Sequence, residues 1–403
     1  MDRDSAFTDA ALADAMAYVI WSEGLQDRRF MDTFCLGFDE AHLPPGIPPN
    51  QSYQAYLFGR RDGISKTPAW AESITGVPAQ TVVNLARRYA TTKPACLLPG
   101  LGPQRTGSGE QTVRTLAMLA CLTGNVGIPG GGAAGTGGVR GPAFQGYPVP
   151  PNPYPGRIPS FLWTRAIESA LEMTPETDGL QGVERLETNI KMIFNLAGNT
   201  LINQHSDINA TIRLLKDTGK CEFILCSDVF MTPSARFADI LLPAPSFFED
   251  ENIAPPWDFG NYLLFNRQVI EPLFGSRFEY RFLEALAQRL GLRDAWSGGY
   301  EGYPQRLEAI YADCRKAEPE LPDYETFKRE GGYYFKGRKP CIAYEEQIRD
   351  LARHPFPTPS GKIEIFSPQL YNLGRHEEVP AIPGYLPCPE GPEDPLAATY
   401  PLN

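Results

Sequence analysis

The sequence predicts an α/β protein built from parallel sheets in layers. Two apolar runs without polar and apolar alternation, 191–196 and 221–226, are typical of strands buried on both faces. A segment with helical apolar spacing, 207–217, joins them, and 240–243 supplies a third short apolar run. Because a strand, helix, strand unit with short links forms a right-handed parallel crossover, we expect a parallel sheet over 190–243.

The first part of the chain is expected to add three helices and a short strand. Residues 9–22, 78–91 and 109–123 show helical spacing of apolar side chains. The run 95–98, bounded by prolines, is expected to be a buried strand. We expect Asp9 to cap the first helix, Pro78 to lie in the first turn of the second, and Gly124 to end the third. The expected apolar faces are Leu12, Met16, Val19 and Ile20 in the first helix, and Val82, Leu85, Ala86 and Tyr89 in the second.

The later segments change character. Residues 278–290 predict a helix that ends at Gly291, and 291–358, aromatic and charged, are expected to be irregular. Residues 361–367 alternate like a strand, and 398–403 predict the beginning of another. We expect five segments: a partial α/β domain with a glycine-rich loop (1–140), a Pro/Gly-rich connection (141–189), a second α/β domain (190–290), an irregular peripheral region (291–358) and a C-terminal segment (359–403).

Residues 124–160 hold a dense run of glycine and then proline, which excludes a regular helix or a central strand. A flexible linker and an ordered loop both fit this composition. Val139, Phe144 and Tyr147 are interleaved with the glycines and could anchor the segment, so an ordered loop is favoured.

Composition excludes several classes of function. The net charge is −11, and without a basic block the chain is not expected to bind nucleic acid. No apolar run reaches the length of a membrane span, and residues 1–16 lack the pattern of a secretory signal. The eight cysteines form no CxxC pair and the four histidines have no metal-like spacing. The chain is therefore expected to hold no metal through its own side chains.

A glycine-rich loop, 99–107, follows the predicted strand 95–98 and opens a helix. Its glycines allow backbone amides to approach a ligand, and a helix N-terminus favours a phosphate. The loop is not GxGxxG, because Arg105 replaces the last glycine. A structural turn explains the glycines but not the adjacent Gln104 and Arg105, so a turn and a binding loop both stay open.

Polar residues follow the two predicted parallel strands. Gly198 and Asn199 come after the first strand, and Ser227 and Asp228 after the second. Ligands of open parallel sheets bind outside these carboxyl ends. The alternatives are ordinary turn residues at the first strand and, for Asp228, a helix cap. The acidic run Glu249, Asp250 and Glu251 could supply an acid and base pair, but a solvated charge run is favoured.

Three stretches together resemble one family: 58–132, NLAGNTLINQHSDINATI (195–212) and SDVFMTPSARFADILLPAPSFFEDEN (227–252). They are similar to the molybdopterin oxidoreductases of the dimethyl sulfoxide reductase type, and within it to the catalytic subunits of bacterial anaerobic dimethyl sulfoxide reductases. The resemblance covers essentially the whole chain. It implies layered parallel-sheet domains that bind dinucleotides, with 359–403 as the truncated start of a C-terminal β-barrel.

The resemblance also implies a function. It points to removal of an oxygen atom from a small sulfoxide or N-oxide at molybdenum-bis(molybdopterin guanine dinucleotide). It further implies a 4Fe-4S cluster in the parent enzyme, an iron-sulfur electron-transfer subunit and a membrane anchor subunit. In the parent family the enzyme lies at the periplasmic face of the membrane after twin-arginine export.

Site residues follow by position. The loop Gly102, Pro103, Gln104 and Arg105 is similar to the family's loop at the pterin and substrate funnel. Asn199, Asn203 and Gln204 match the loop after a strand in the other nucleotide-binding domain, and Ser227 with Asp228 matches a guanine or ribose contact. Thr8 and Asp9 look like the remnant of a Gly-Thr-Asp cofactor contact in which Phe7 replaces the glycine.

Other family features have no match here: the cluster cysteines, the export signal and the molybdenum-ligating serine. The catalytic residue is therefore not assigned, and the resemblance implies the middle half of an enzyme. We expect the chain to be an inactive fragment when expressed alone, and then to stay in the cytoplasm. The alternative is a non-catalytic pterin or nucleotide-binding module complemented by another chain.

Overall fold

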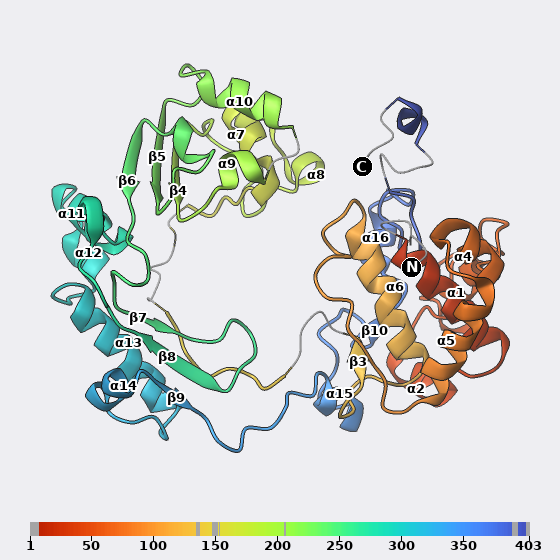
Figure 1. Cartoon of the computed structure of the whole chain (residues 1–403). Coiled ribbons are helices and arrows are strands. Elements are labelled where there is room, and N and C mark those ends of the chain that lie inside the picture. Colours follow the sequence, from red (N-terminus) through yellow and green to blue (C-terminus); the bar gives the residue numbers. More distant parts are fainter. Residues whose placement is uncertain are drawn as a thin grey trace. The chain divides into compact units, whose positions relative to one another are not determined.

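The computed structural model describes residues 8–133, 138–146, 152, 154–204, 207–388 and 394–399. It contains two compact units (Figure 1). Unit 1 consists of Met1–Gly138 with Lys339–Asn403, and unit 2 of Val139–Arg338. Unit 1 is therefore built from both ends of the sequence. The finer division into five domains stays a prediction.

Unit 1 is mainly helical. Its core helix is α1 (Asp9–Ser22), which packs against α4, α5 and α6 and is buried along nearly its whole length. The helix is confirmed, but Thr8 occupies the cap position and Asp9 is the first helical residue, so the cap expected at Asp9 is wrong. The other principal helices are α2 (Arg28–Phe34), α3 (Tyr53–Leu57), α4 (Pro68–Thr75), α5 (Ala79–Thr91) and α6 (Gly109–Leu122).

Helix α5 corrects one detail of the expected apolar face. Pro78 precedes the helix as its cap, and Val82 and Ala86 are buried. Leu85 is 44% exposed, so the prediction that it lies on the buried face is wrong. Helix spacing alone marks a broad apolar stripe, and the packing partner decides which edge of that stripe is covered.

Two short parallel strand pairs complete unit 1. Strand β1 (Cys35–Leu36) pairs with β10 (Ile363–Glu364), and β2 (Cys96–Leu97) pairs with β3 (Gly132–Ala133). The predicted strand at 95–98 therefore exists, but it is not buried, since Cys96 and Leu98 are exposed. The alternation at 361–367 produces only the two residues of β10.

The end of the chain differs from its prediction. Helices α15 (Glu345–Arg349) and α16 (Pro368–Asn372) flank β10. A strand was expected to begin at 398. This prediction is wrong for Ala398, because Ala398 is the last residue of the 3-10 helix η6 (Pro395–Ala398). Its last residues, 400–403, lie outside the described residues.

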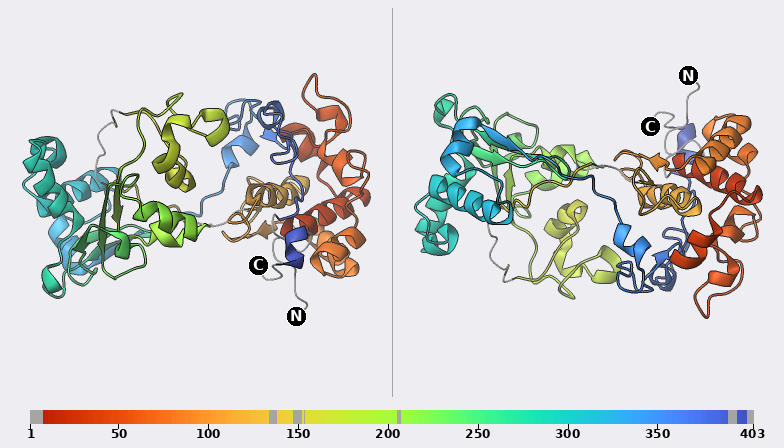
Figure 2. Two further views of the ribbon diagram at one scale, coloured as in Figure 1. Left: turned by 90° about the horizontal axis from the view of Figure 1, so that it is seen from above. Right: turned by 90° about the horizontal axis from the view of Figure 1, so that it is seen from below.

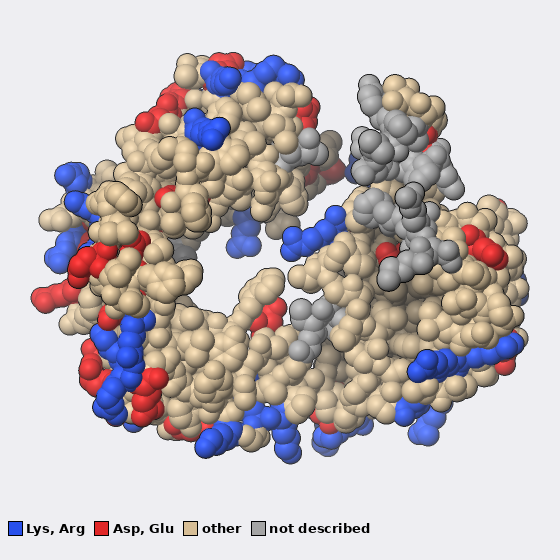
Figure 3. Space-filling model, viewed as in Figure 1, with Lys and Arg blue, Asp and Glu red and all other residues tan. Residues whose placement is uncertain are grey.

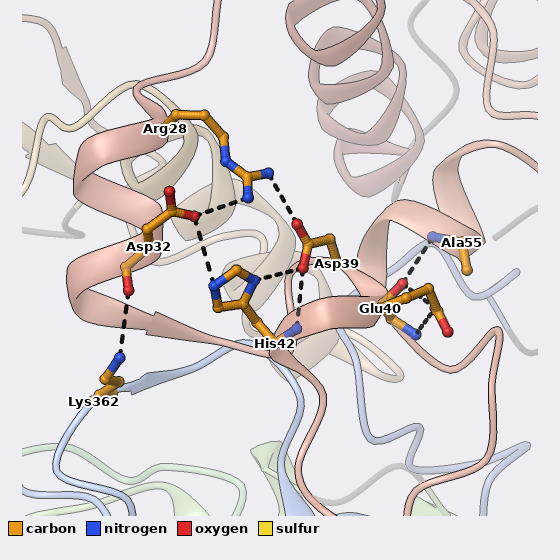
Figure 4. Close-up of polar contacts among 8 residues, drawn as sticks. Arg28, Asp32, Asp39, Glu40, His42, Ala55 and Lys362 are labelled. Carbon is orange, nitrogen blue, oxygen red and sulfur yellow. Dashed lines mark hydrogen bonds and ion pairs between the residues drawn. The ribbon is translucent and has the colours of Figure 1, made fainter.

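A polar network holds β1 and its following turn (Figure 4). Asp39 accepts hydrogen bonds from Arg28 Nη1 at 2.9 Å and shares one with His42 Nδ1 at 2.6 Å. Burial of the Asp39 carboxylate by itself raises its pKa, but these hydrogen bonds outweigh burial and hold the pKa below its ordinary value. Lys362, next to β10, donates to the backbone carbonyl of Asp32 at 3.4 Å. The network thus helps to fix the returning C-terminal segment beside α2.

The predicted parallel sheet is confirmed in unit 2. It has the order β4 (Met192–Leu196), β5 (Phe223–Asp228), β6 (Ile240–Pro243), with Met192 opposite Phe223 and Leu225 opposite Ile240. Helix α10 (Ile208–Lys216) connects β4 to β5 and packs with α7 (Trp163–Ser169) over Ile224 and Cys226 (Figure 1 and Figure 2). Only β5 is buried along most of its length, because β4 and β6 are edge strands.

A second, antiparallel sheet in unit 2 contains β7 (Asn252–Ala254), β8 (Tyr262–Asn266) and β9 (Gly332–Tyr334). The expectation that 291–358 is irregular is wrong. The segment contains α12 (Arg293–Ser297), α13 (Tyr303–Ala317) and α14 (Tyr324–Glu330) as well as β9 and α15. Its aromatic residues build a buried core with β8, in which Tyr311 stacks on Phe327 at 4.5 Å between ring centroids. That core supports helices whose own sequence pattern is weak.

The glycine and proline run is ordered where it is described. Arg140 forms a bridge with Phe259, Gly260 N donates to the carbonyl of Val139 at 2.8 Å, and Phe144 packs on the aromatic core. These contacts favour the ordered loop over the linker for 138–146. Tyr147, the third expected anchor, lies outside the described residues. Helices α8 (Pro175–Asp178) and α11 (Glu279–Arg289) complete the principal helices of this unit.

Charged side chains of both signs are interspersed over the two units on the face shown in Figure 3. Among the helices of the described residues, none is long and apolar enough to cross a membrane.

Candidate functional site

A cavity of about 540 Å³ lies at the carboxyl ends of β4, β5 and β6. Gly198 and Asn199, which follow β4, and Asp228, the last residue of β5, all line it. Aromatic side chains contribute as well, with Phe230, Phe247 and Phe278 in the lining. A cavity therefore lies where the strand ends predicted a ligand site, and the volume of the cavity suits a small organic ligand.

The loop after β4 is fastened to the loop after β5. Asn199 Oδ1 accepts a hydrogen bond from the backbone amide of Ser234 at 3.0 Å. Inside β4, the side-chain oxygen of Asn195 accepts a hydrogen bond from the Thr200 hydroxyl at 2.6 Å. The side-chain nitrogen of Asn195 donates to the carbonyl of Gly198. Asn199 thus has a structural role, and the backbone of this loop forms one wall of the cavity.

Asp228 is half-buried, and its Oδ1 accepts a hydrogen bond from the amide of Phe230 at 3.1 Å. This is a turn contact. The helix-cap alternative for Asp228 is wrong, because the 3-10 helix η4 (Ala235–Phe237) begins after Ser234. The first amide of this helix, that of Ala235, donates to the hydroxyl of Thr232 and not to Asp228. One carboxylate oxygen of Asp228 is held by the turn, which leaves the other for a ligand.

Ser227 is fully buried, and its hydroxyl donates to Glu279 Oε1 at 2.9 Å. Glu279 is the first residue of α11 and lines the cavity. Sequence reasoning missed it, because an acidic residue in the first turn of a helix is explained by the helix dipole alone.

The acidic run at 249–251 is not a solvated charge run, so that expectation is wrong. Glu249 is only 8% exposed and accepts hydrogen bonds from the amides of Ser246 at 2.6 Å and Leu273 at 3.0 Å, which lower its pKa. Asp250 lines the cavity, and Glu251 pairs with Lys328 at 2.9 Å. The three carboxylates therefore make different contacts, and these contacts depend on residues that are distant in the sequence.

Asn203 and Gln204 do not belong to the cavity lining. They lie at the end of α9 (Thr200–Asn203) and directly after it, and both are exposed. Asn203 ends a short helix that begins at Thr200, and Gln204 follows that helix. Their contact with the cofactor stays a prediction.

The glycine-rich loop belongs to unit 1 and connects β2 to α6, as predicted. Gly102, Gln104 and Arg105 are exposed and Pro103 is half-buried. Gly109 fits the loop closely against α6, because a Cβ there would lie 2.5 Å from the carbonyl oxygen of Gln104. The Arg105 side chain makes no polar contact with the other described residues, and so it is available to a ligand.

Thr8 and Asp9 stand at the start of α1 in unit 1, where Thr8 is half-buried and Asp9 exposed. Phe7, which stands where the family motif has a glycine, lies outside the described residues. Within the part of the chain that the structure describes, no group of three or more His, Cys, Asp or Glu side chains could hold a metal ion.

The model of one protein family, Molybdopterin oxidoreductase, matches residues 3–289. Dimethyl sulfoxide reductase DmsA of Escherichia coli K12 is 44% identical over 98% of this chain and 50% of its own length. Dimethyl sulfoxide/trimethylamine N-oxide reductase of Rhodobacter capsulatus is 30% identical over 98% of this chain and 48% of its own. The chain spans about half the length of the curated relatives it matches.

A solved structure, acetylene hydratase from Pelobacter acetylenicus, superposes with a TM-score of 0.62, covering 98% of this chain and 52% of the hydratase. At 21% identity this likeness shows the fold alone. The family match covers most of the chain and both loops that follow β4 and β5. The chain belongs to the molybdopterin oxidoreductase family.

Proposed function

We propose that this chain forms part of the catalytic subunit of a molybdenum-dependent sulfoxide or N-oxide reductase. The observation that carries the proposal is the cavity at the carboxyl ends of β4–β6, lined by Asn199 and Asp228, in a chain of this family. The names of the relatives support the substrate class, since they are reductases of dimethyl sulfoxide or trimethylamine N-oxide.

The cavity in unit 2 suits the nucleoside end of a molybdopterin guanine dinucleotide. Asp228, Asp250 and Glu279 offer acceptor oxygens, and guanine and ribose carry several hydrogen-bond donors. Phe230 and Phe247, which are 76% and 70% exposed, offer faces for a planar ring. When bound, the cofactor supplies the molybdenum at which an oxygen atom leaves the substrate. The residues of this cavity hold and orient its nucleotide end.

The loop Gly102, Pro103, Gln104 and Arg105 is proposed to contact the pterin cofactor or the substrate from unit 1, as are Thr8 and Asp9. We further propose, following the family resemblance, the bis(guanine dinucleotide) form of the cofactor and a 4Fe-4S cluster in the whole enzyme. An iron-sulfur subunit and a membrane anchor subunit would deliver electrons at the periplasmic face of the membrane.

A chimera tests the proposed reaction. The region of Escherichia coli DmsA that aligns with this chain is replaced by the chain, and sulfoxide-dependent oxidation of a reduced viologen dye is measured. We expect turnover with dimethyl sulfoxide or trimethylamine N-oxide, and a molybdenum content like that of the parent. A folded chimera that holds molybdenum but reduces neither substrate contradicts the proposed reaction. A folded chimera without molybdenum supports the non-catalytic alternative.

Arg105→Lys in the same chimera should lower turnover while stability stays unchanged. A guanidinium fork binds anions through two parallel hydrogen bonds that an ammonium does not reproduce. Because Arg105 is exposed, the substitution is expected to change the free energy of unfolding by less than about 0.5 kcal/mol. Steady-state kinetics and urea unfolding measure the two effects. Unchanged kinetics would remove Arg105 from the site.

A further inference from the structure

Residues 379–385, here called the strap, belong to unit 1 and form neither a helix nor a strand. Residues 380–384 are nevertheless all buried, and Ala381 and Ile382 pack in the apolar core of the unit. Buried backbone groups outside regular secondary structure need other hydrogen-bond partners. Side chains of α1, α3 and α6 supply such partners at the two ends of the strap.

Arg114 of α6 holds the first end of the strap. Its Nη1 donates to the carbonyl oxygen of Pro380 at 3.0 Å, and its Nη2 donates to that of Ala381 at 2.8 Å. Nη1 also donates to Gln111 Oε1 at 3.1 Å, one turn earlier in the helix. Burial, opposed by the nearby charge of Glu110, lowers the pKa of Arg114 to about 10. Backbone carbonyls therefore satisfy a guanidinium that is largely withdrawn from water, and its planar fork fixes their direction.

The buried carboxylate of Asp14 holds the other end. The backbone amide of Tyr385 donates to Asp14 Oδ2 at 2.9 Å and also to the hydroxyl oxygen of Tyr56 at 3.0 Å. Gly384 lies so close to Tyr56 that a Cβ there would be 2.8 Å from the ring carbon Cζ. The strap is thus fixed at both ends, and it connects α1 and α3 to α6.

The two halves of α6 are held in different ways. Its side chains that join the apolar core of unit 1, among the described residues, all lie in the second half: Leu116, Met118, Leu119, Cys121 and Leu122. The glycine-rich loop rests on the first half, where Gly109 fits against the carbonyl of Gln104 and the amide of Gln111 donates to the carbonyl of Ser108 at 2.9 Å. The half that carries the loop therefore has no side chain in that core, and Arg114 anchors it through the strap.

We propose that the strap positions the glycine-rich loop 99–107 through Arg114, which makes Arg114 a positioning residue for the ligand that this loop binds. The proposal rests on the proposed function of the loop. Arg114 acts through α6 and not by contact with the ligand. Without its hydrogen bonds to the strap, the first turns of α6 open more often, and Gln104 and Arg105 lose a fixed position.

Hydrogen exchange of the full 403-residue chain, without ligand, tests the positioning. The reporters are three hydrogen-bonded amides of the loop and of the first turn of α6, those of Arg105, Gly109 and Gln111. Arg114→Met keeps an unbranched apolar stem but removes both donors to the strap. We expect the three amides to exchange about ten- to a hundredfold faster, as for loss of a hydrogen bond from a charged group. The amides of α5 should keep their rates.

Two further variants make the test specific. Arg114→Lys keeps the charge but has no fork for two carbonyls, so its exchange should lie between those of the wild type and Arg114→Met. Arg88→Gln removes an exposed arginine of α5 and should leave exchange of the loop unchanged. Wild-type exchange of the loop in both Arg114 variants overturns the positioning role. Equal acceleration in the loop and in α5 also overturns it, because it marks a loss of global stability.

Kinetics of the chimera with DmsA connect the loop to its ligand. Arg114→Lys should raise the KM for dimethyl sulfoxide more than it lowers kcat, because a displaced loop weakens binding while the groups that contact the substrate remain. Faster exchange of the loop with an unchanged KM contradicts both the ligand contact proposed for the loop and the role of Arg114 toward that ligand. Unchanged exchange overturns the role of the strap and leaves the proposed function standing.

Discussion

Replacing Asp14 by leucine is expected to destabilise unit 1 by about 3 to 5 kcal/mol, as when one member of a buried charged network is removed. The Asp14 carboxylate is fully buried in α1. It accepts hydrogen bonds from the hydroxyls of Tyr53 at 2.8 Å and Tyr56 at 2.9 Å, and from the amide of Tyr385 at 2.9 Å. Leucine removes the acceptor that these three donors share. Urea unfolding measures the loss, and hydrogen exchange assigns it to unit 1.

Asp14→Asn is the matched control, because it keeps an acceptor oxygen and nearly the same volume. We expect it to lose much less stability than Asp14→Leu. Equal losses in the two variants would show that packing, and not the hydrogen-bond network, governs this site.

The same carboxylate predicts a pH dependence. Burial, opposed by the hydrogen bonds from Tyr53 and Tyr56, raises the pKa of Asp14 from 3.8 to about 6. Since the folded-state pKa lies above the unfolded value, the stabilising contribution is fully present below pH 3.8 and is lost as the pH rises through 6. Relative to Asp14→Asn, the wild type should lose about 3 kcal/mol between pH 3.8 and 7. Parallel pH profiles of the two proteins would contradict this.

Asp228→Ala is expected to raise the dissociation constant for guanosine 5′-monophosphate by about ten- to a hundredfold, the range for a hydrogen bond to a charged group. Asp228 ends the central strand and lines the cavity. Titration calorimetry on the full chain measures the effect. Wild-type affinity in this variant would remove Asp228 from the binding site.

Asp228→Asn separates charge from structure, since its amide oxygen still accepts from Phe230 N. Weak binding by both variants assigns the effect to the charge. If only Asp228→Ala binds weakly, the turn at Phe230 is what the cavity needs, and the carboxylate has no direct contact with the ligand.

Sequence reasoning succeeded where the signal is local. The strands β4, β5 and β6 are short apolar runs with brief connections, and α1, α6, α10 and α11 carry helical spacing of apolar residues. Strand direction and strand ends follow from these patterns through general rules of chain connection. For this reason the sequence alone was enough to place Asn199 and Asp228 at the edge of a parallel sheet.

The missed features depend on residues distant in the sequence. The charge pattern of 249–251 is the same whether Glu249 faces water or the amides of Ser246 and Leu273. The aromatic residues of 291–358 form helices because β8 and its neighbours cover them. Local pattern does not encode such coverage, since tertiary packing supplies most of the stability of a helix with weak propensity.

By itself, the sequence determined the family, the parallel order of the central sheet and the two strand ends at which a ligand is proposed to bind. Only the tertiary structure decided that Glu279 joins Ser227 at the cavity, that Asp14 binds Tyr385, and that β10 returns to β1. The physical reason is that propensity and periodicity act over a few residues. Burial and hydrogen-bond partners are set by contacts between residues far apart along the chain, which become defined only when the chain has folded.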